Sequence, residues 1–244
     1  MSAEAGSTTV LLVGALLVRM VLTGDYLRYV RSGMGPWLVV AGVLLVGLGA
    51  TGLVTAVRRR TAAVPAQDGH EETDAHDGHA HGAQRVGWLL LGPVLALLLV
   101  TPPALGSFGV DRTAAGAVQV RAGGAVFAAL PAGGGPTALT LAEFDQRAAD
   151  RAGASLGRAP VRLTGFVAAP GDDGGVRIAR YQIACCAADA VAAVVRLVGL
   201  PTTPARESWL TVVGTYRGSG PDGVPELSVT GSDQVPPPVD PYES

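Results

Sequence analysis

Three apolar runs within the first 105 residues restrict the fold of this chain more than any other feature. They cover residues 8–24, 37–57 and 88–105, and the second run contains no charged side chain. At 1.5 Å per residue, each run is about long enough to cross the hydrocarbon core of a bilayer as a helix. The second and third runs begin with Trp37 and Trp88, and tryptophan favours the membrane interface. The sequence therefore predicts a multi-pass membrane protein with three transmembrane helices in residues 1–105.

The first run is interrupted only by Arg19, and the leader before it carries no basic residue. These features favour a retained anchor over a cleaved signal peptide. Arg19 lies near the predicted outer end of its helix, so its long side chain is expected to reach the headgroups. A polar contact to a partner subunit is the alternative.

The distribution of arginine predicts the orientation, because cytoplasmic flanks retain positive charge. Segment 58–87, between the second and third runs, holds four arginines, and the short loop between the first two runs holds two. We therefore expect the N-terminus and segment 58–87 to be cytoplasmic and the domain after residue 105 to be extracytoplasmic. The arginines concerned are Arg58, Arg59, Arg60 and Arg85 in the segment, and Arg28 and Arg31 in the loop.

Segment 58–87 also contains every histidine of the protein, interleaved with acidic residues. Imidazole nitrogens beside carboxylates suit zinc and other transition metals, and His-rich tracts are typical of metal-handling segments. The alternative is a hydrophilic linker whose acidic residues only keep it solvated. The predicted ligands are His70, His76, His79 and His81.

The C-terminal half contains short β-rich segments in place of long apolar runs. This pattern predicts a small extracytoplasmic domain over residues 139–244. Residues 106–138 are rich in Ala and Gly and are interpreted as a linker, with a short strand expected near 118–120. Thr140 followed by Glu143 is the pattern of a helix N-cap, so an amphipathic helix is expected over residues 140–150.

Five short β-rich segments separated by turn residues follow this helix. The first alternates cleanly, with Val161 and Leu163 on one face. Five strands at this spacing favour a small antiparallel β-barrel of the OB-like kind, and the overall fold class is an α+β membrane protein. The final VPPPVDPYES is not expected to continue the sheet. The expected strands cover residues 161–168, 176–186, 193–199, 209–217 and 225–231.

Two adjacent cysteines, Cys185 and Cys186, stand in the run CCAADA with Asp189 three residues later. Neighbouring side chains on a regular strand point to opposite faces, so the cysteines can share a metal only if the strand ends or bulges there. Thiolates and a carboxylate would suit zinc or another transition metal. Two alternatives stay open: cysteines that fill the barrel core while Asp189 caps a turn, and a redox pair.

The run ARYQIACCAADA at 179–190, WLTVVGT at 209–215 and the Pro-rich ending resemble the YcgQ-like family of permease subunits, which are membrane proteins with a C-terminal CCxADA motif. The resemblance covers about residues 8–242. It implies an accessory subunit that works beside a larger integral membrane permease, in the context of metal homeostasis. The His-rich segment departs from the family pattern.

The function expected from these features is that of a bacterial permease accessory subunit, whose external domain docks on or gates its partner. All 18 basic residues are arginine, as is typical of a GC-rich bacterial genome. The alternative is a stand-alone membrane metal-binding or thiol-redox protein. An enzyme is not expected, because the external domain has no histidine to act as a general base. The net charge of −2 gives no basic field for nucleic acid.

Overall fold

A computed structural model describes the chain in two compact units. The first unit comprises residues 1–26 and 33–102, and the second comprises residues 27–32 and 103–244. The turn at residues 27–32 therefore belongs to the second unit, although it connects the two helices of the first. The residues described are 3–62, 92–96, 99–100, 103–110, 127–131, 133–168, 175–220 and 222–243.

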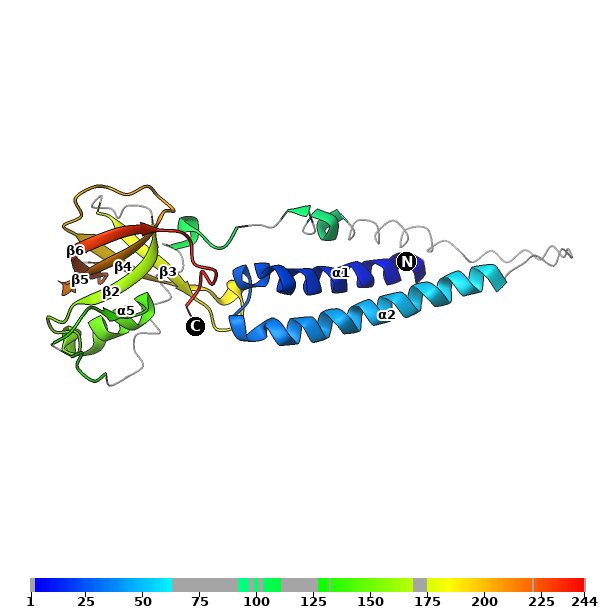
Figure 1. Ribbon diagram of the computed structural model, residues 1–244, viewed down its shortest axis with the longest axis horizontal. Coiled ribbons are helices and arrows are strands. Elements are labelled where there is room, and N and C mark those ends of the chain that lie inside the picture. The colour runs from blue at the N-terminus through cyan, green and yellow to red at the C-terminus, as the bar shows by residue number, and fades with distance from the viewer. Residues whose placement is uncertain are drawn as a thin grey trace, which may run out of the picture. The chain divides into compact units, whose positions relative to one another are not determined.

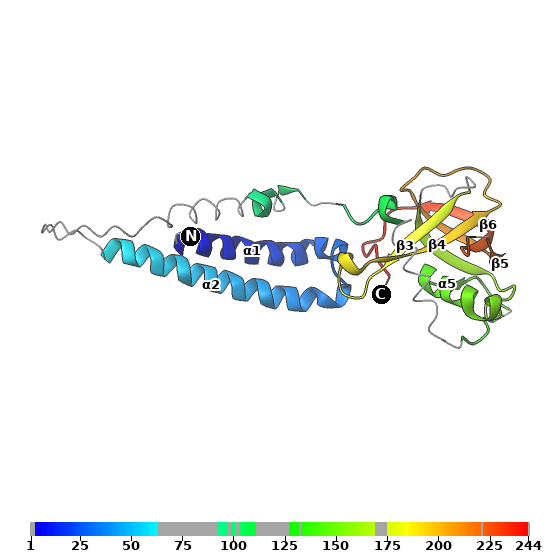
Figure 2. The same cartoon turned by 180° about the vertical axis from the view of Figure 1, so that it is seen from behind.

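The first unit is built on two antiparallel helices, α1 (Ala3–Thr23) and α2 (Gly35–Ala62), which lie side by side in both ribbon views (Figures 1 and 2). Their apolar windows, Ala5–Thr23 and Ser32–Arg59, have mean hydropathies of 1.9 and 2.3. Both helices are long and apolar enough to cross a membrane. The first two predicted runs are therefore helices that could be membrane spans.

Glycines allow α1 and α2 to approach closely. A Cβ atom added at Gly49 would lie 2.6 Å from the backbone nitrogen of Leu11, and one added at Gly14 would lie 2.7 Å from the carbonyl oxygen of Gly42. Small residues at such positions are typical of helix pairs in membranes, where close backbone approach provides the packing energy.

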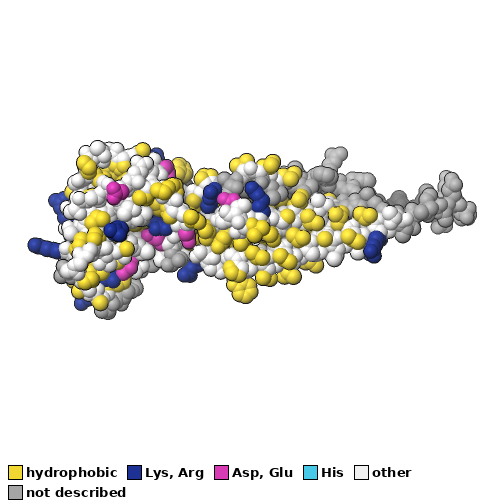
Figure 3. All heavy atoms as spheres, viewed as in Figure 1, with side chains coloured by type: hydrophobic (Ala, Val, Ile, Leu, Met, Phe, Trp, Pro, Cys, Tyr) yellow, Lys and Arg dark blue, Asp and Glu magenta, His cyan; other side chains and the backbone are white. Residues whose placement is uncertain are grey.

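The outer surface of α2 is apolar. Trp37 is 71% exposed and Leu48 is 66% exposed, and the space-filling view shows hydrophobic side chains over much of the surface of the helices (Figure 3). A soluble protein rarely exposes such a continuous apolar surface. This surface is compatible with a lipid environment or with a protein partner.

The third predicted run, 88–105, is described only in part. Residues 92–96 are helical, and the Val100 N–H donates to the carbonyl of Ala96 at 2.8 Å. Its other residues up to 102, apart from 99 and 100, lie outside the described residues, so three transmembrane helices are not shown. Residues 63–91, which include all four histidines, also lie outside the described residues, and the predicted histidine site stays a prediction.

The second unit contains a closed five-stranded β-barrel, which confirms the predicted strand count. Its strands follow one another in the order β2–β3–β4–β6–β5, and β5 pairs back with β2. The barrel pairings are antiparallel as predicted, except that β4 pairs in parallel with β6. The strands are β2 (Val161–Val167), β3 (Arg177–Gln182), β4 (Val191–Val198), β5 (Trp209–Ser219) and β6 (Pro225–Val235).

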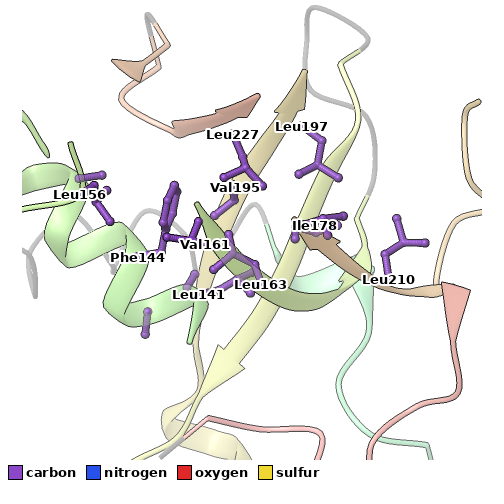
Figure 4. Close-up of a cluster of buried hydrophobic side chains, with 14 of the residues drawn as sticks. Leu141, Phe144, Leu156, Val161, Leu163, Ile178, Val195, Leu197, Leu210 and Leu227 are labelled. Atoms are coloured by element: carbon purple, nitrogen blue, oxygen red, sulfur yellow. The ribbon is translucent and has the colours of Figure 1, made fainter. Parts of the chain in front are cut away.

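Alternating side chains explain why these segments form strands around a core. Val161 and Leu163 on β2 are fully buried, whereas Arg162 between them is exposed. Helix α5 (Leu141–Ala149) packs Leu141 and Phe144 into the same core, as the close-up shows (Figure 4).

The start of α5 agrees with the predicted N-cap. The Thr140 hydroxyl accepts the Glu143 N–H at 3.0 Å. The Glu143 carboxylate forms an ion pair with Arg147 at 2.8 Å, one helical turn further on.

The described residues of segment 106–138 belong to the second unit. Val110 is buried, Leu130 packs against the core, and the short strand β1 (Thr137–Ala138) pairs in parallel with β2. The strand expected near 118–120 lies outside the described residues. Short 3-10 helices occupy Asp25–Arg28 (η1), Ser32–Met34 (η2), Ser107–Gly109 (η3), Asp150–Gly153 (η4) and Ala187–Asp189 (η5).

Candidate metal centre

The two cysteines lie just beyond the end of strand β3. The strand ends at Gln182, four residues earlier than the predicted strand 176–186. The prediction was too long because the backbone turns out of the sheet here: the N–H groups of Ala184, Cys185 and Cys186 donate to a side chain instead of a neighbouring strand. This early end meets the condition under which both cysteines can face one ligand.

Asp189 is the acceptor that organises this turn. Its Oδ1 accepts the Ala184 N–H at 2.8 Å, and its Oδ2 accepts the N–H groups of Cys185 and Cys186 at 2.8 and 3.2 Å. In return, the Cys186 sulfur accepts the Asp189 N–H, which forms a reciprocal cap on η5. The interpretation of Asp189 as a turn cap is therefore confirmed, and the cap fixes the backbone that carries both thiols.

The turn gathers three candidate ligand atoms at one point. The sulfur atoms of Cys185 and Cys186 and a carboxylate oxygen of Asp189 all lie within 4.8 Å of one another. Ligand atoms around a tetrahedral zinc ion lie roughly 3.5 Å apart, so small side-chain movements would bring this set to a metal. Two sulfurs and one oxygen form a donor set that fits zinc-like cations.

Exposure decides against the interpretation of the cysteines as core residues. Cys185 is exposed and Cys186 is half-buried, and both thiols are free. The buried clusters of the barrel consist of other side chains. The thiols are therefore open to solutes, metals and reagents.

The electrostatics of the turn favour a protonated Cys185 at neutral pH. A hydrogen bond to the Asp189 carboxylate, together with Cys186, raises the pKa of the Cys185 thiol from 9.0 to about 11. The same thiol, with the backbone N–H groups, lowers the pKa of Asp189 to about 2. Reactive redox cysteines need a lowered pKa, so this environment disfavours nucleophilic thiol chemistry. A cation can still replace the thiol proton, because metal binding releases protons from its ligands.

The turn between α1 and α2 borders the cysteines. Val30 and Cys186 form an isolated antiparallel bridge, in which the Arg31 N–H donates to the Cys185 carbonyl at 3.1 Å. The Ala187 N–H donates to the Tyr29 carbonyl at 2.7 Å. We call residues Tyr29–Arg31 the clasp. It holds the cysteine turn through backbone hydrogen bonds.

The C-terminal residues also hold the unit together. The Tyr242 hydroxyl donates to the Arg28 carbonyl at 2.7 Å and accepts the Leu105 N–H at 3.2 Å. The Arg180 guanidinium donates to the backbone carbonyl of Asp240 at 2.8 Å. The ending VPPPVDPYES leaves the barrel as predicted, except that Glu243 returns to form a parallel bridge with Gln182.

The structure brings together three of the predicted ligands: Cys185, Cys186 and Asp189. Sequence reasoning missed the clasp and the C-terminal contacts. The clasp joins backbone groups to backbone groups, and the C-terminal contacts join the side chains of Tyr242 and Arg180 to distant backbone groups. Because nearly every residue carries these backbone groups, no residue pattern identifies the partners.

Comparison with curated proteins and with solved structures found no match. A family model does match the part of the chain that carries the cysteines, the five barrel strands and the C-terminal contacts. Residues 156–243 match the family model of the DUF1980 C-terminal domain.

Proposed function

We propose that this protein is an accessory subunit of a bacterial membrane permease, and that its C-terminal barrel binds a zinc-like cation. The observation that carries the proposal is the cluster of two thiols and one carboxylate within 4.8 Å on an exposed turn. Cation binding is favoured over nucleophilic thiol catalysis, because the raised pKa of Cys185 disfavours a thiolate nucleophile.

The kind of metal follows from the donors. Two sulfur ligands select borderline and soft cations such as zinc, whereas calcium and magnesium prefer sets made entirely of oxygen. The Asp189 carboxylate already accepts three backbone N–H groups, so its main contribution is to position both cysteines.

Membrane anchoring is supported by α1 and α2. Both are apolar over a length that spans a bilayer, they pack through glycines, and α2 exposes large hydrophobic side chains such as Trp37 and Leu48. Arg58 and Arg59 at the end of α2 favour a cytoplasmic position for that end.

The clasp supports an extracytoplasmic position of the barrel. If α1 and α2 cross the bilayer, their connecting turn is extracytoplasmic, and the barrel that pairs with this turn must lie on the same side. The chain leaves α2 at Ala62 on the cytoplasmic side, so it has to cross the membrane again before Pro103. The predicted third span at 88–105 supplies this crossing, which agrees with the helical residues 92–96.

A permease partner is supported by two considerations. Helices α1 and α2 are in direct contact and therefore enclose no path for a substrate. The resemblance to the YcgQ-like permease subunits, on the CCAADA run among others, implies that such a chain works beside a larger transporter. The exposed apolar surface of α2 offers room for that contact.

The metal site is tested on the full-length protein purified in detergent. Zinc content is measured for the wild type, for Cys185→Ser/Cys186→Ser, and for Ala187→Ser, which changes the same turn but keeps both thiols. A variant with alanine at His70, His76, His79 and His81 removes the histidine ligands, so the metal that remains is the metal held by the cysteine turn. We expect stoichiometric zinc in all variants except the double serine variant, and zinc that survives the loss of both thiols would refute the site.

The partner and the topology are tested in cells of the source organism. Purification of the tagged chain from solubilised membranes should recover a larger permease, and recovery of the chain alone would favour the stand-alone metal-binding protein. A membrane-impermeant maleimide should label Cys185 in intact cells. Labelling only after the membrane is opened would place the barrel in the cytoplasm.

A further inference from the structure

We infer that the cysteine turn is an exchange site, in which the chain supplies three ligands and a nitrogen or sulfur donor of a membrane-embedded partner supplies the fourth. This inference rests on the proposed metal site and concerns how that site is used. It makes the cation a cargo that passes between the barrel and the partner.

The first step is the number of ligands. Structural zinc sites are closed by four protein ligands, whereas sites with three protein ligands keep one position open. Among the residues that the structure describes, the group with donor atoms close enough to hold a metal is Cys185, Cys186 and Asp189 alone. The histidine segment lies on the other side of the bilayer in the proposed topology.

The second step is that the fold does not depend on the metal. The barrel is stabilised by two buried hydrophobic clusters, and the cysteines belong to neither. The turn itself is held by the cap that Asp189 provides. A structural metal would be enclosed by the residues that it orders, yet Cys185 is exposed to solvent.

The third step is that hydrogen bonds within the chain fix the turn. Three N–H groups fix the Asp189 carboxylate, and the clasp fixes the carbonyl of Cys185 and the N–H of Ala187. A preformed site with an open position can load and release a cation without local unfolding, which suits exchange.

The fourth step is the position of the turn along the chain. Arg31, which is bonded to Cys185, lies four residues before Gly35, where α2 begins. A four-residue stretch spans at most about 14 Å. The backbone beside the cysteines is therefore tethered within that distance of the start of a proposed membrane span, so a partner embedded in the same membrane can reach the site.

Cobalt(II) tests the inference, because its visible absorption reports thiolate ligation and coordination number. The full chain in detergent, carrying alanine at the four histidines, is loaded with cobalt(II) and titrated with imidazole as a stand-in for the partner's donor. We expect a thiolate-ligated tetrahedral spectrum that shifts as imidazole binds, and rapid loss of the metal to a chelator. Zinc X-ray absorption should show two sulfur ligands per metal.

The outcomes separate this inference from the metal site itself. Cobalt could bind through both cysteines with a spectrum that does not change on addition of imidazole, and could resist chelators. This result would indicate a closed site and overturn the exchange role. Four sulfur ligands per metal would mean that two copies of the chain share one ion, which also overturns it. If no cysteine-dependent metal binds at all, the proposed function itself fails.

Discussion

Val30, in the turn between two apolar helices, is paired with Cys186, in the turn beyond strand β3, by an isolated antiparallel bridge. These residues are more than 150 positions apart in the sequence. The pairing joins the candidate metal ligands to the segment that connects α1 and α2. Any change in the cysteine turn can therefore be transmitted to the turn between the helices, and the reverse.

The first prediction concerns this bridge. Arg31→Pro removes the N–H that donates to the Cys185 carbonyl, whereas Arg31→Ala removes the side chain and keeps the N–H. Loss of one such bond costs about 0.5–1.5 kcal/mol, so cobalt(II) affinity should fall roughly two- to tenfold in the proline variant alone. Hydrogen exchange of the Ala187 amide, which donates to Tyr29, should accelerate in parallel. Equal exchange rates and affinities in both variants would contradict a coupling through the clasp.

The second prediction concerns the thiol of Cys185. Its pKa is raised to about 11 chiefly by its hydrogen bond to Asp189, so Asp189→Asn should return the pKa toward 9.0. At pH values near 9.0 the thiolate fraction, and with it the rate of alkylation by iodoacetamide, should rise roughly ten- to fiftyfold. Both proteins keep Cys186, which contributes to the raised pKa, and tandem mass spectrometry separates alkylation of Cys185 from that of Cys186. Asp233→Asn, an exposed change on β6, serves as the control, and an unchanged rate in Asp189→Asn would count against the hydrogen bond.

The third prediction concerns the buried carboxyl of Glu243. Its oxygens accept the N–H groups of Leu141 and Ala142, at 2.8 and 2.9 Å, in the first turn of α5. Burial raises the pKa of Glu243 above its ordinary value of 4.5, although these N–H groups and Arg180 act in the opposite direction. The folded state therefore favours the protonated form. The resulting stabilisation is complete below the unfolded-state pKa and is lost as pH rises through the folded-state pKa.

Glu243→Gln isolates this effect because glutamine does not titrate. The variant should be less stable by about 1–3 kcal/mol, since its amide NH2 cannot accept the second backbone N–H. The difference in unfolding free energy between wild type and variant should be largest in acid and should shrink as pH rises toward neutrality. Denaturant unfolding of the full chain at a series of pH values measures it. A difference that grows with pH would show that the hydrogen bonds outweigh burial.

The fourth prediction concerns the packing of α1 against α2. Gly49→Leu places a side chain where a Cβ would already lie 2.6 Å from the backbone of Leu11, whereas nothing lies within 4 Å of a Cβ at Gly47. Overpacking of this kind costs about 1–3 kcal/mol. Gly49→Leu should therefore lower the unfolding temperature in detergent, and Gly47→Leu should leave it close to that of the wild type. Equal unfolding temperatures would mean that the helices do not pack through Gly49.

Several elements of the fold could be predicted from local pattern. The alternation of Val161 and Leu163 with polar neighbours gives β2, and the spacing of Thr140 and Glu143 gives the start of α5, because burial and capping act over a few residues. Strand β6 extends to Val235, beyond the predicted end at 231, although its last residues are largely exposed. Backbone pairing with β5 extends the strand there, and exposed polar residues give no alternation by which to detect it.

The sequence by itself determined the apolar helices, the five strands and the presence of two adjacent thiols beside an aspartate. Only the tertiary structure decided that β3 ends before Cys185, that both thiols are accessible, and that Tyr29–Arg31 and Glu243 reach their distant partners. The physical reason is that hydrophobic periodicity and capping depend on side chains that are close in sequence. The long-range partners of the cysteine turn and of Glu243 are instead backbone N–H and C=O groups, which are nearly the same in every residue and are brought together only when the chain has folded.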